Sequence, residues 1–317
     1  MKAVQTPTLA DIRAARERIS GSAIRTPLIR LNAEDAPAEI YLKLENLQPI
    51  GSFKIRGAAN AMRLVGKEKL SNGVYTASAG NMAQGVAWNA REMGLPCEVI
   101  VPDRAPETKL AAIKRLGGKV VKVPFDEWWQ VIIEHTYPGI DSFFIHPVSD
   151  SAVIAGNGTI GLEIVEDLPE VETIVIPFGG GGLSSGIAAA IRSLKSNTRI
   201  YACEVETAAP LKASLKAGAP LTVEYIPSFV DGIGGRSVLE EMWPLVSNLI
   251  DDSLVVSLQQ VSQALKLLIE RNRVIAEGAG AAAVAAALSG MAGSGKIVCI
   301  VSGGNIDSDK LAEIIST

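Results

Sequence analysis

Runs of β-branched and other apolar residues alternate along this chain with amphipathic or alanine-rich stretches, and this alternation limits the possible folds most. After a short extended segment at 40–44, the runs that predict strands lie at 73–77, 97–101, 119–123, 173–178, 199–204 and 296–301. Most are rich in Val and Ile without polar alternation, as in strands buried on both faces. The other stretches predict helices at 9–19, 58–64, 82–93, 107–115, 183–194, 258–270 and 279–288. This β-α-β order predicts an α/β fold with parallel-rich twisted sheets covered by helices.

Composition and charge narrow the class of protein. Hydrophobic residues make up 48% of the 317 residues and charged residues 20%, which suits a packed core and argues against global disorder. The formal charge of −4 argues against nucleic acid or an anionic membrane as the main partner. Cys97, Cys203 and Cys299 have neither metal-type nor disulfide-type spacing. The first residues lack the pattern of a secretory signal, and glycines interrupt the uncharged stretch 173–191, so we expect a cytoplasmic protein without a membrane span.

The strongest chemical signal lies between the predicted strand at 173–178 and the next predicted helix. Four glycines stand there in a row before Leu183: Gly179, Gly180, Gly181 and Gly182. Glycine lets backbone N–H groups approach an anion closely, and the start of a helix adds a favourable dipole, so this loop suits a phosphate. The spacing matches neither a dinucleotide fingerprint nor a P-loop. Taken alone, the loop is equally well explained as a tight turn that needs glycine.

Two further loops between a strand and a helix carry polar side chains. Thr76–Asn81 places the hydroxyl of Ser78 and the amide of Asn81 beside the free N–H groups of a helix start, which suits a carboxylate ligand. The segment Ser302–Asn305 follows the last predicted strand in the same way. Either loop, taken singly, also fits an ordinary helix cap and turn.

A lysine beside an aromatic residue completes the set. Lys54 follows Phe53 and lies between Gly51 and Gly57. In this order the four motifs resemble the fold-type II pyridoxal-phosphate (PLP) enzymes, the family of threonine dehydratase, serine racemase and tryptophan synthase β. The resemblance extends from about Ile24 to the end of the chain. The segments 41–46 and 149–163 are similar to the threonine/serine dehydratase branch. The resemblance implies a tryptophan synthase β-like fold of two domains: a large one, 1–47 with 147–317, and a small inserted one, 48–146.

The resemblance also implies a role for each matching residue. Lys54 would form a Schiff base with the PLP aldehyde, and its amine must be neutral to attack. Phe53 would lie against the cofactor ring, Asn81 would bond its hydroxyl and Ser302 its pyridine nitrogen. The glycine loop and Leu183 would hold the phosphate. The substrate would be bound by the segment Ser78, Ala79, Gly80, Asn81 and Met82.

The implied activity is that of an ammonia-lyase that converts L-threonine or L-serine to a 2-oxo acid and ammonia. A serine at the pyridine nitrogen, Ser302, favours β-elimination or β-replacement over transamination, because a carboxylate there would keep the ring protonated. Serine racemase is an alternative, but the family's racemases have serine where Ala79 stands, and alanine cannot transfer a proton. Met82 replaces the usual histidine of the family and predicts, as another alternative, a phenylserine-type substrate with a bulky β-substituent. A non-catalytic protein that binds PLP or an amino acid is the remaining alternative.

The other expectations concern metal, histidines and assembly. Glu204 and Ala208 match positions at which some relatives bind a divalent cation, but Pro210 replaces an acidic ligand, so we expect no metal. The two histidines, His135 and His146, match no family catalytic position and are expected to be surface or packing residues. Trp128 and Trp129 are candidates for the pocket entrance or the core. A dimer or tetramer of identical chains is expected from the resemblance.

Overall fold

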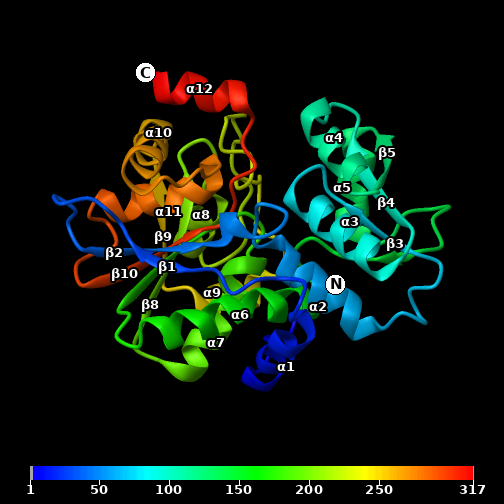
Figure 1. Cartoon of the computed structure of the whole chain (residues 1–317), viewed down its shortest axis with the longest axis horizontal. Coiled ribbons are helices and arrows are strands. Elements are labelled where there is room, and N and C mark those ends of the chain that lie inside the picture. Colours follow the sequence, from blue (N-terminus) through cyan, green and yellow to red (C-terminus); the bar gives the residue numbers. More distant parts are fainter. Residues whose placement is uncertain (1–2, 317) are drawn as a thin grey trace.

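A computed structural model of the chain, which describes residues 3–316, contains two parallel-rich sheets (Figure 1). The larger sheet has the strand order β1 (Leu28–Arg30), β2 (Glu39–Leu44), β10 (Lys296–Val301), β7 (Thr173–Pro177), β8 (Arg199–Val205) and β9 (Asp252–Val256). Only β1 is antiparallel to its neighbour. The smaller sheet is all parallel, in the order β5 (Lys119–Val123), β4 (Cys97–Pro102), β3 (Val74–Ala77) and β6 (Phe143–Phe144). The predicted α/β class is confirmed.

Helices cover both faces of the larger sheet. One face packs against α6 (Ser151–Asp167), α7 (Gly182–Leu194) and α9 (Trp243–Leu249), with α1 (Leu9–Ile19) outside them. The other packs against α10 (Leu258–Leu267), its π-helical continuation Leu268–Asn272, α11 (Gly278–Leu288) and α12 (Ser308–Ser316). In β7, Ile174 and Ile176 face the first layer while Val175 faces the second. Both faces are therefore apolar, which explains why these strands lack polar alternation.

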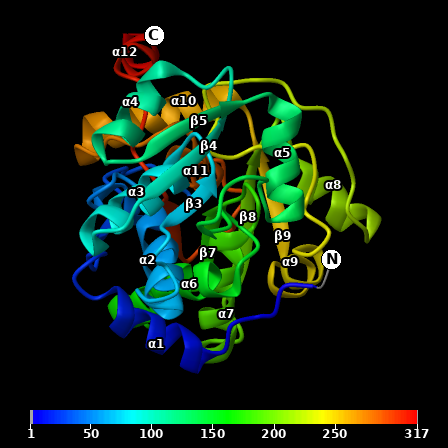
Figure 2. The ribbon, with the colours of Figure 1, turned by 90° about the vertical axis from the view of Figure 1, so that its right-hand side faces the viewer.

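The smaller sheet lies beside the larger one and has its own covering helices (Figures 1 and 2). One face packs against α2 (Lys54–Val65), α3 (Asn81–Met93) and α4 (Glu107–Arg115), and the other against α5 (Phe125–Glu134). The remaining elements are a 3-10 turn at Glu45–Leu47 and α8 (Pro210–Ala217), which follows β8. Helix α2 contacts both α3 and α6, so it joins the two halves of the molecule.

The predicted strands and helices are present, most with bounds that differ by a residue or two, but α6 was missed. Its 17 residues have only a weak amphipathic pattern, and the twelve from Val153 to Ile164 are all buried. Three glycines inside it allow close packing: a Cβ on Gly156, Gly158 or Gly161 would lie within 2.5–2.8 Å of α2 or α7. Elements as short as β1 and β6 give too few residues for a pattern, and β9, α5, α8, α9 and α12 were also not predicted.

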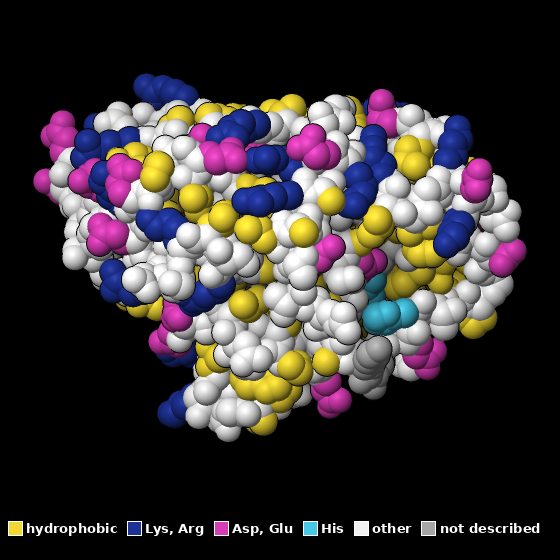
Figure 3. Space-filling model, turned by 90° about the horizontal axis from the view of Figure 1, so that it is seen from below, with side chains coloured by type: hydrophobic (Ala, Val, Ile, Leu, Met, Phe, Trp, Pro, Cys, Tyr) yellow, Lys and Arg dark blue, Asp and Glu magenta, His cyan; other side chains and the backbone are white. Residues whose placement is uncertain are grey.

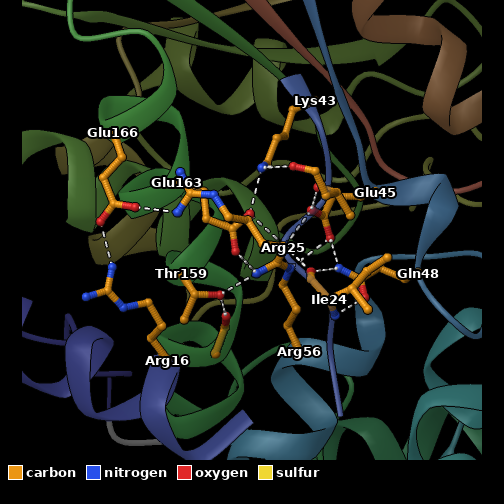
Figure 4. Close-up of polar contacts among 12 residues, drawn as sticks. Arg16, Ile24, Arg25, Lys43, Glu45, Gln48, Arg56, Thr159, Glu163 and Glu166 are labelled. Carbon is orange, nitrogen blue, oxygen red and sulfur yellow. Dashed lines mark hydrogen bonds and ion pairs between the residues drawn. The ribbon is translucent and has the colours of Figure 1, made fainter. Parts of the chain in front are cut away.

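Helix α2 begins four residues earlier than predicted, and a buried charge network fixes its first turn (Figure 4). Arg56 donates hydrogen bonds to both carboxylate oxygens of Glu45 and of Glu163, at 2.6–3.0 Å. Lys43 pairs with Glu163 at 2.6 Å, and none of these four side chains is more than 5% exposed. The two cations balance the two carboxylates, so the first turn of α2 is held against α6 and against the 3-10 turn that follows β2.

The surface shows no single-sign charged field on the face seen in Figure 3, where basic and acidic side chains are interspersed. Within residues 3–316, no helix is long and apolar enough to cross a bilayer. In both sheets most parallel strands are followed by a helix, and in such sheets ligands bind at the carboxyl ends of the strands.

Candidate active site

A cavity of about 410 Å³ opens at the carboxyl ends of β3 and β7, with residues from the end of β10 in its wall. Ligands of open parallel sheets bind at this edge. All the predicted site residues line the cavity: Phe53, Lys54, Ser78, Ala79, Gly80, Asn81, Met82, Gly179, Gly180, Gly181, Gly182, Leu183 and Ser302. The structure thus brings together segments that are up to about 250 residues apart in the sequence.

Lys54 is the first residue of α2, and its amine points at a backbone carbonyl. Nζ donates a hydrogen bond to the carbonyl of Pro147 at 2.9 Å and lies 5.2 Å from the centre of the Phe53 ring. Burial lowers the pKa of Lys54 to about 8, although the nearby carboxyl of Glu277 favours the charged form. Near neutral pH a far larger fraction of this amine is uncharged than of an ordinary lysine, as a nucleophile or base requires.

The glycine loop forms a cradle at the start of α7. Gly181 is the N-cap residue, with φ of 93°, a conformation that favours glycine. A Cβ on Gly180 would lie 2.6 Å from a methyl of Val148, so the backbone there fits closely against that side chain. The first N–H groups of an α-helix have no partner inside the helix, and its dipole favours an anion there. These features fit the phosphate of PLP.

The loop that follows β3 is arranged in a similar way. Ser78 Oγ accepts a hydrogen bond from the N–H of Gly80, and Gly80 caps α3 without a side-chain bond. Asn81 is bonded at both ends: its Nδ2 donates to Glu277 at 2.9 Å, and its Oδ1 accepts from Asn305 at 2.8 Å. One N–H of the Asn81 amide is left for a ligand, and the amides that begin α3 suit a carboxylate. Met82, 2% exposed, also belongs to the core of the smaller sheet.

Ser302 and Glu277 form the floor of the cavity. The carbonyl of Ser302 accepts the N–H of Phe53 at 3.0 Å, which joins the end of β10 to the lysine segment. Glu277 is buried, and burial, reinforced by Asp231, raises its pKa to about 7. A Cβ on Gly303 would lie 2.6 Å from the Glu277 carboxylate, so glycine at that position leaves space for the acid. The resemblance to the family indicated that the segments 277–280 and 231–234 shape the pocket, but no sequence motif identified Glu277 as a titrating group.

Charged and aromatic side chains form the mouth of the cavity. Lys109 of α4 pairs with Asp231, from the loop before α9, at 2.6 Å. Trp128 and Trp129 both line the cavity together with Phe125, and the ring centres of neighbours in this group are 5.5 and 6.1 Å apart. Helix α5, which was not predicted, therefore supplies an aromatic wall.

Glu204, the first candidate metal ligand, caps a helix in this structure. Its two carboxylate oxygens accept hydrogen bonds from the N–H groups of Leu211 and Lys212 at 2.8 Å and from Ser253 at 2.6 Å. Pro210 begins this helix, α8, at the position where the family pattern has an acid. These hydrogen bonds occupy acceptor positions of the carboxylate that a cation would otherwise use.

Comparisons with known proteins agree with this arrangement. The family model described as pyridoxal-phosphate dependent enzyme matches residues 19–303. The L-threonine ammonia-lyase of Thermotoga maritima is 41% identical over 98% of this chain and 78% of its own length. Maize serine racemase has a TM-score of 0.89 at 33% identity, covering 98% of both chains. The processed threonine deaminase isoform 2 of Solanum lycopersicum has a TM-score of 0.88 at 33% identity, covering 100% of this chain and 96% of that one.

Proposed function

Because this chain belongs to the pyridoxal-phosphate dependent enzyme family, we propose that it is an ammonia-lyase that converts L-threonine and L-serine to a 2-oxo acid and ammonia. The observation that carries the proposal is the amine of Lys54, which has a pKa of about 8 and lies in one cavity with the glycine cradle. The relatives named for threonine, 41% identical in the case of Thermotoga maritima, support the substrate class.

We assign the binding of the cofactor to residues that line the cavity. The N–H groups of the glycine loop and Leu183 hold the phosphate, Lys54 holds the aldehyde carbon, and Phe53 packs against the ring. We assign Ser302 to the ring nitrogen and the free N–H of Asn81 to the ring hydroxyl. The amides between Ser78 and Met82 receive the substrate carboxylate.

Bound PLP withdraws electrons from the α-carbon of an amino acid and so acidifies its α-proton. Lys54, once its amine is free and neutral, removes that proton as a general base. The electron pair left at the α-carbon forms the Cα=Cβ bond as the Cβ–O bond breaks, and the β-hydroxyl leaves as water with a proton returned by the Lys54 ammonium. Water then hydrolyses the released enamine, through its imine tautomer, to the 2-oxo acid and ammonia. The hydroxyl of Ser302, unlike a carboxylate, does not keep the ring nitrogen protonated, which favours elimination over transamination. Glu277, with a pKa of about 7, accepts a hydrogen bond from the Asn81 amide, so its charge affects the residue that we assign to the ring hydroxyl.

The test is release of 2-oxo acid by the PLP-loaded protein from L-threonine, L-serine and L-threo-phenylserine, measured side by side. Release from L-threonine or L-serine supports the proposal, and Lys54→Ala should abolish both turnover and the imine absorbance of the cofactor. Turnover of Lys54→Ala at the parent rate would refute the assignment of the base. A protein that binds PLP but releases nothing from any substrate would favour a binding protein instead.

The racemase alternative is tested in the same reactions. Racemisation needs a second group that delivers a proton to the opposite face, and Ala79 offers none. We therefore expect D-serine to form far more slowly than pyruvate. Ala79→Ser should raise D-serine formation; a parent protein that makes D-serine faster than pyruvate would overturn the lyase assignment.

A second candidate substrate is a β-hydroxy amino acid with an aromatic β-substituent, and the aromatic wall of α5 favours it. Phe125 and Trp129 are 51% and 37% exposed at the mouth, which costs hydration free energy unless an apolar ligand covers them. Trp129→Ala should lower kcat/KM for phenylserine at least about tenfold and change threonine little. Met82→His tests the same preference from the α3 side. If the ratio of kcat/KM for phenylserine to kcat/KM for threonine were unchanged in both variants, this substrate would be refuted.

We also propose the domain division and the assembly. Residues 48–146 form a small domain, since all four strands of the smaller sheet fall within them, and the flanks 1–47 and 147–317 form the large one. We propose a homo-oligomer in the cytoplasm. Leu47 and Ile275 are about half exposed, and Asn46 donates a hydrogen bond to the carbonyl of Ile275, so the two apolar side chains lie on adjoining segments that we assign to a subunit contact. Light scattering after size exclusion tests the assembly: a monomer would refute it.

A further inference from the structure

The segment from His146 to Ser149 connects the lysine and the glycine cradle. The carbonyl of Pro147 accepts the Lys54 amine at 2.9 Å, and the side chain of Val148 fills the space above Gly180. The contact of Lys54 with Pro147 and that of Gly180 with Val148 therefore both depend on the backbone path of residues 146–149.

The buried ring of His146 fixes the path of this segment through hydrogen bonds to its backbone. Its Nδ1 accepts the N–H of Val148 at 3.0 Å and that of Ser149 at 2.6 Å, so the backbone folds around the ring nitrogen. Its Nε2 lies 3.1 Å from the carbonyl of Ile132 in α5. Because Nδ1 accepts twice, the proton must be on Nε2, where it is donated to Ile132. Burial, with His135 beside it, lowers the pKa of His146 to about 3, so the ring stays neutral throughout the working range.

A metal role for this region is the obvious competing interpretation. His135, His146 and Glu241 lie close enough to surround an ion, with ligand atoms within 4.8 Å of one another. His146, however, uses both ring nitrogens for the backbone, which leaves Glu241 and His135, and the Nε2 of His135 also lies 3.5 Å from the Ser149 hydroxyl. Nε2 of His135 lies 3.7 Å from a carboxylate oxygen of Glu241, and the side chain of His135 is 36% exposed.

We propose that His146 is a positioning residue: by accepting two backbone N–H groups, it holds the Pro147 carbonyl where it receives the amine of Lys54. It does not touch the substrate. The carbonyl gives the free amine a fixed place during turnover, so the loss of this arrangement should lower kcat more than it raises KM. The effect on turnover rests on the proposed function, but the effect on the Lys54 amine does not.

Two substitutions separate this role from simple packing. In His146→Asn the side-chain oxygen takes the place of Nδ1 and keeps the acceptor for Val148 and Ser149. In His146→Gln the side-chain nitrogen takes the place of Nε2 and keeps the donor to Ile132 but loses that acceptor. If His146 positions the Pro147 carbonyl, His146→Asn should keep the parent's Lys54 titration midpoint and kcat, and His146→Gln should not. His135→Asn is the control, because the His135 ring contacts the His146 ring, with centres 4.3 Å apart, and bonds neither Pro147 nor Lys54.

The first measurement uses the cofactor-free protein. Acetic anhydride labelling across pH, read by mass spectrometry at Lys54, gives the titration midpoint of its amine. A lost carbonyl acceptor destabilises the ammonium form, so we expect His146→Gln to lower the midpoint by about half a unit or more, while His146→Asn and His135→Asn match the parent.

The second measurement is steady-state kinetics of the PLP-loaded proteins. We expect kcat of His146→Gln to fall about tenfold with KM within about twofold, and His146→Asn to stay within about threefold of the parent. Equal losses in both His146 variants, or an unchanged Lys54 midpoint in His146→Gln, would overturn the proposal. If the midpoint shifts as expected while no 2-oxo acid is released by the parent, only the proposed function fails.

Discussion

Arg56→Met should destabilise the protein strongly, because it removes one cation from a balanced buried cluster. The guanidinium holds both carboxylate oxygens of Glu45 and of Glu163, together with the hydroxyl of Thr159 and the carbonyl of Ile24. After the substitution, two buried carboxylates face Lys43 alone. Breaking a buried pair by removing one partner costs about 3–5 kcal/mol. That is a large part of the stability of a typical protein, about 5–15 kcal/mol.

The pH dependence has a definite sign. Burial on its own would raise the pKa of Glu45, but Arg56 and Thr26 outweigh it and lower the pKa below its usual value. A lowered pKa contributes stability above the pKa of the unfolded chain, about 4.5, and that stability is lost only as the pH falls through the native pKa. In Arg56→Met the effect of burial remains, so the freed carboxylate takes up a proton at higher pH. The difference in free energy of unfolding between the parent and Arg56→Met should therefore be smaller at pH 5 than at pH 7.5.

The assay is urea unfolding of the parent, Arg56→Met and the double variant Glu45→Gln/Arg56→Met at both pH values. The double variant leaves one cation and one carboxylate, so it should recover at least about 1 kcal/mol of the single variant's loss, because coupled neighbours are not additive. A single variant that loses less than about 1 kcal/mol at pH 7.5, or a double variant less stable than the single one, would refute the reasoning.

Three further results are expected at the site. Gly180→Ala forces a methyl within 2.6 Å of the Val148 side chain, so PLP affinity should fall at least about tenfold by equilibrium titration, and unchanged affinity would exclude a phosphate role for this loop. Glu277 has its pKa raised to about 7 and so changes from neutral to charged as the pH rises through 7; Glu277→Gln should remove an inflection near pH 7 from kcat/KM, and a profile identical to the parent's would contradict this. Because Glu204 accepts three hydrogen bonds at the start of α8, dialysis against a chelator should leave turnover within about twofold, whereas a loss restored by Mg²⁺ or Ca²⁺ would show that a cation is needed.

The sequence by itself was sufficient for the class of fold and for the lysine, glycine and serine segments of the cavity, but not for Glu277 or the aromatic residues of α5. Strands such as β7 are covered by helices on both faces, so their apolar runs stand out without knowledge of the partners. Glycine loops and a lysine beside an aromatic residue are local patterns, and in parallel sheets the carboxyl ends of strands meet at one edge. For that reason motifs read separately, from Phe53 to Ser302, lie around one cavity.

Other features of the protein were decided only by the tertiary structure, because they depend on contacts between segments that are distant in the sequence. Helix α6 packs through glycines that resemble loop residues until α2 and α7 are placed against them. The pKa of Lys54 depends on burial and on the field of Glu277, more than 200 residues away in the sequence, and the pKa of Glu277 depends on burial and on the field of Asp231. His146 looked like a packing residue, yet its two ring nitrogens join α5 to the carbonyl that receives the lysine. Hydrogen-bond partners and desolvation are properties of the folded surroundings, and no local pattern contains them.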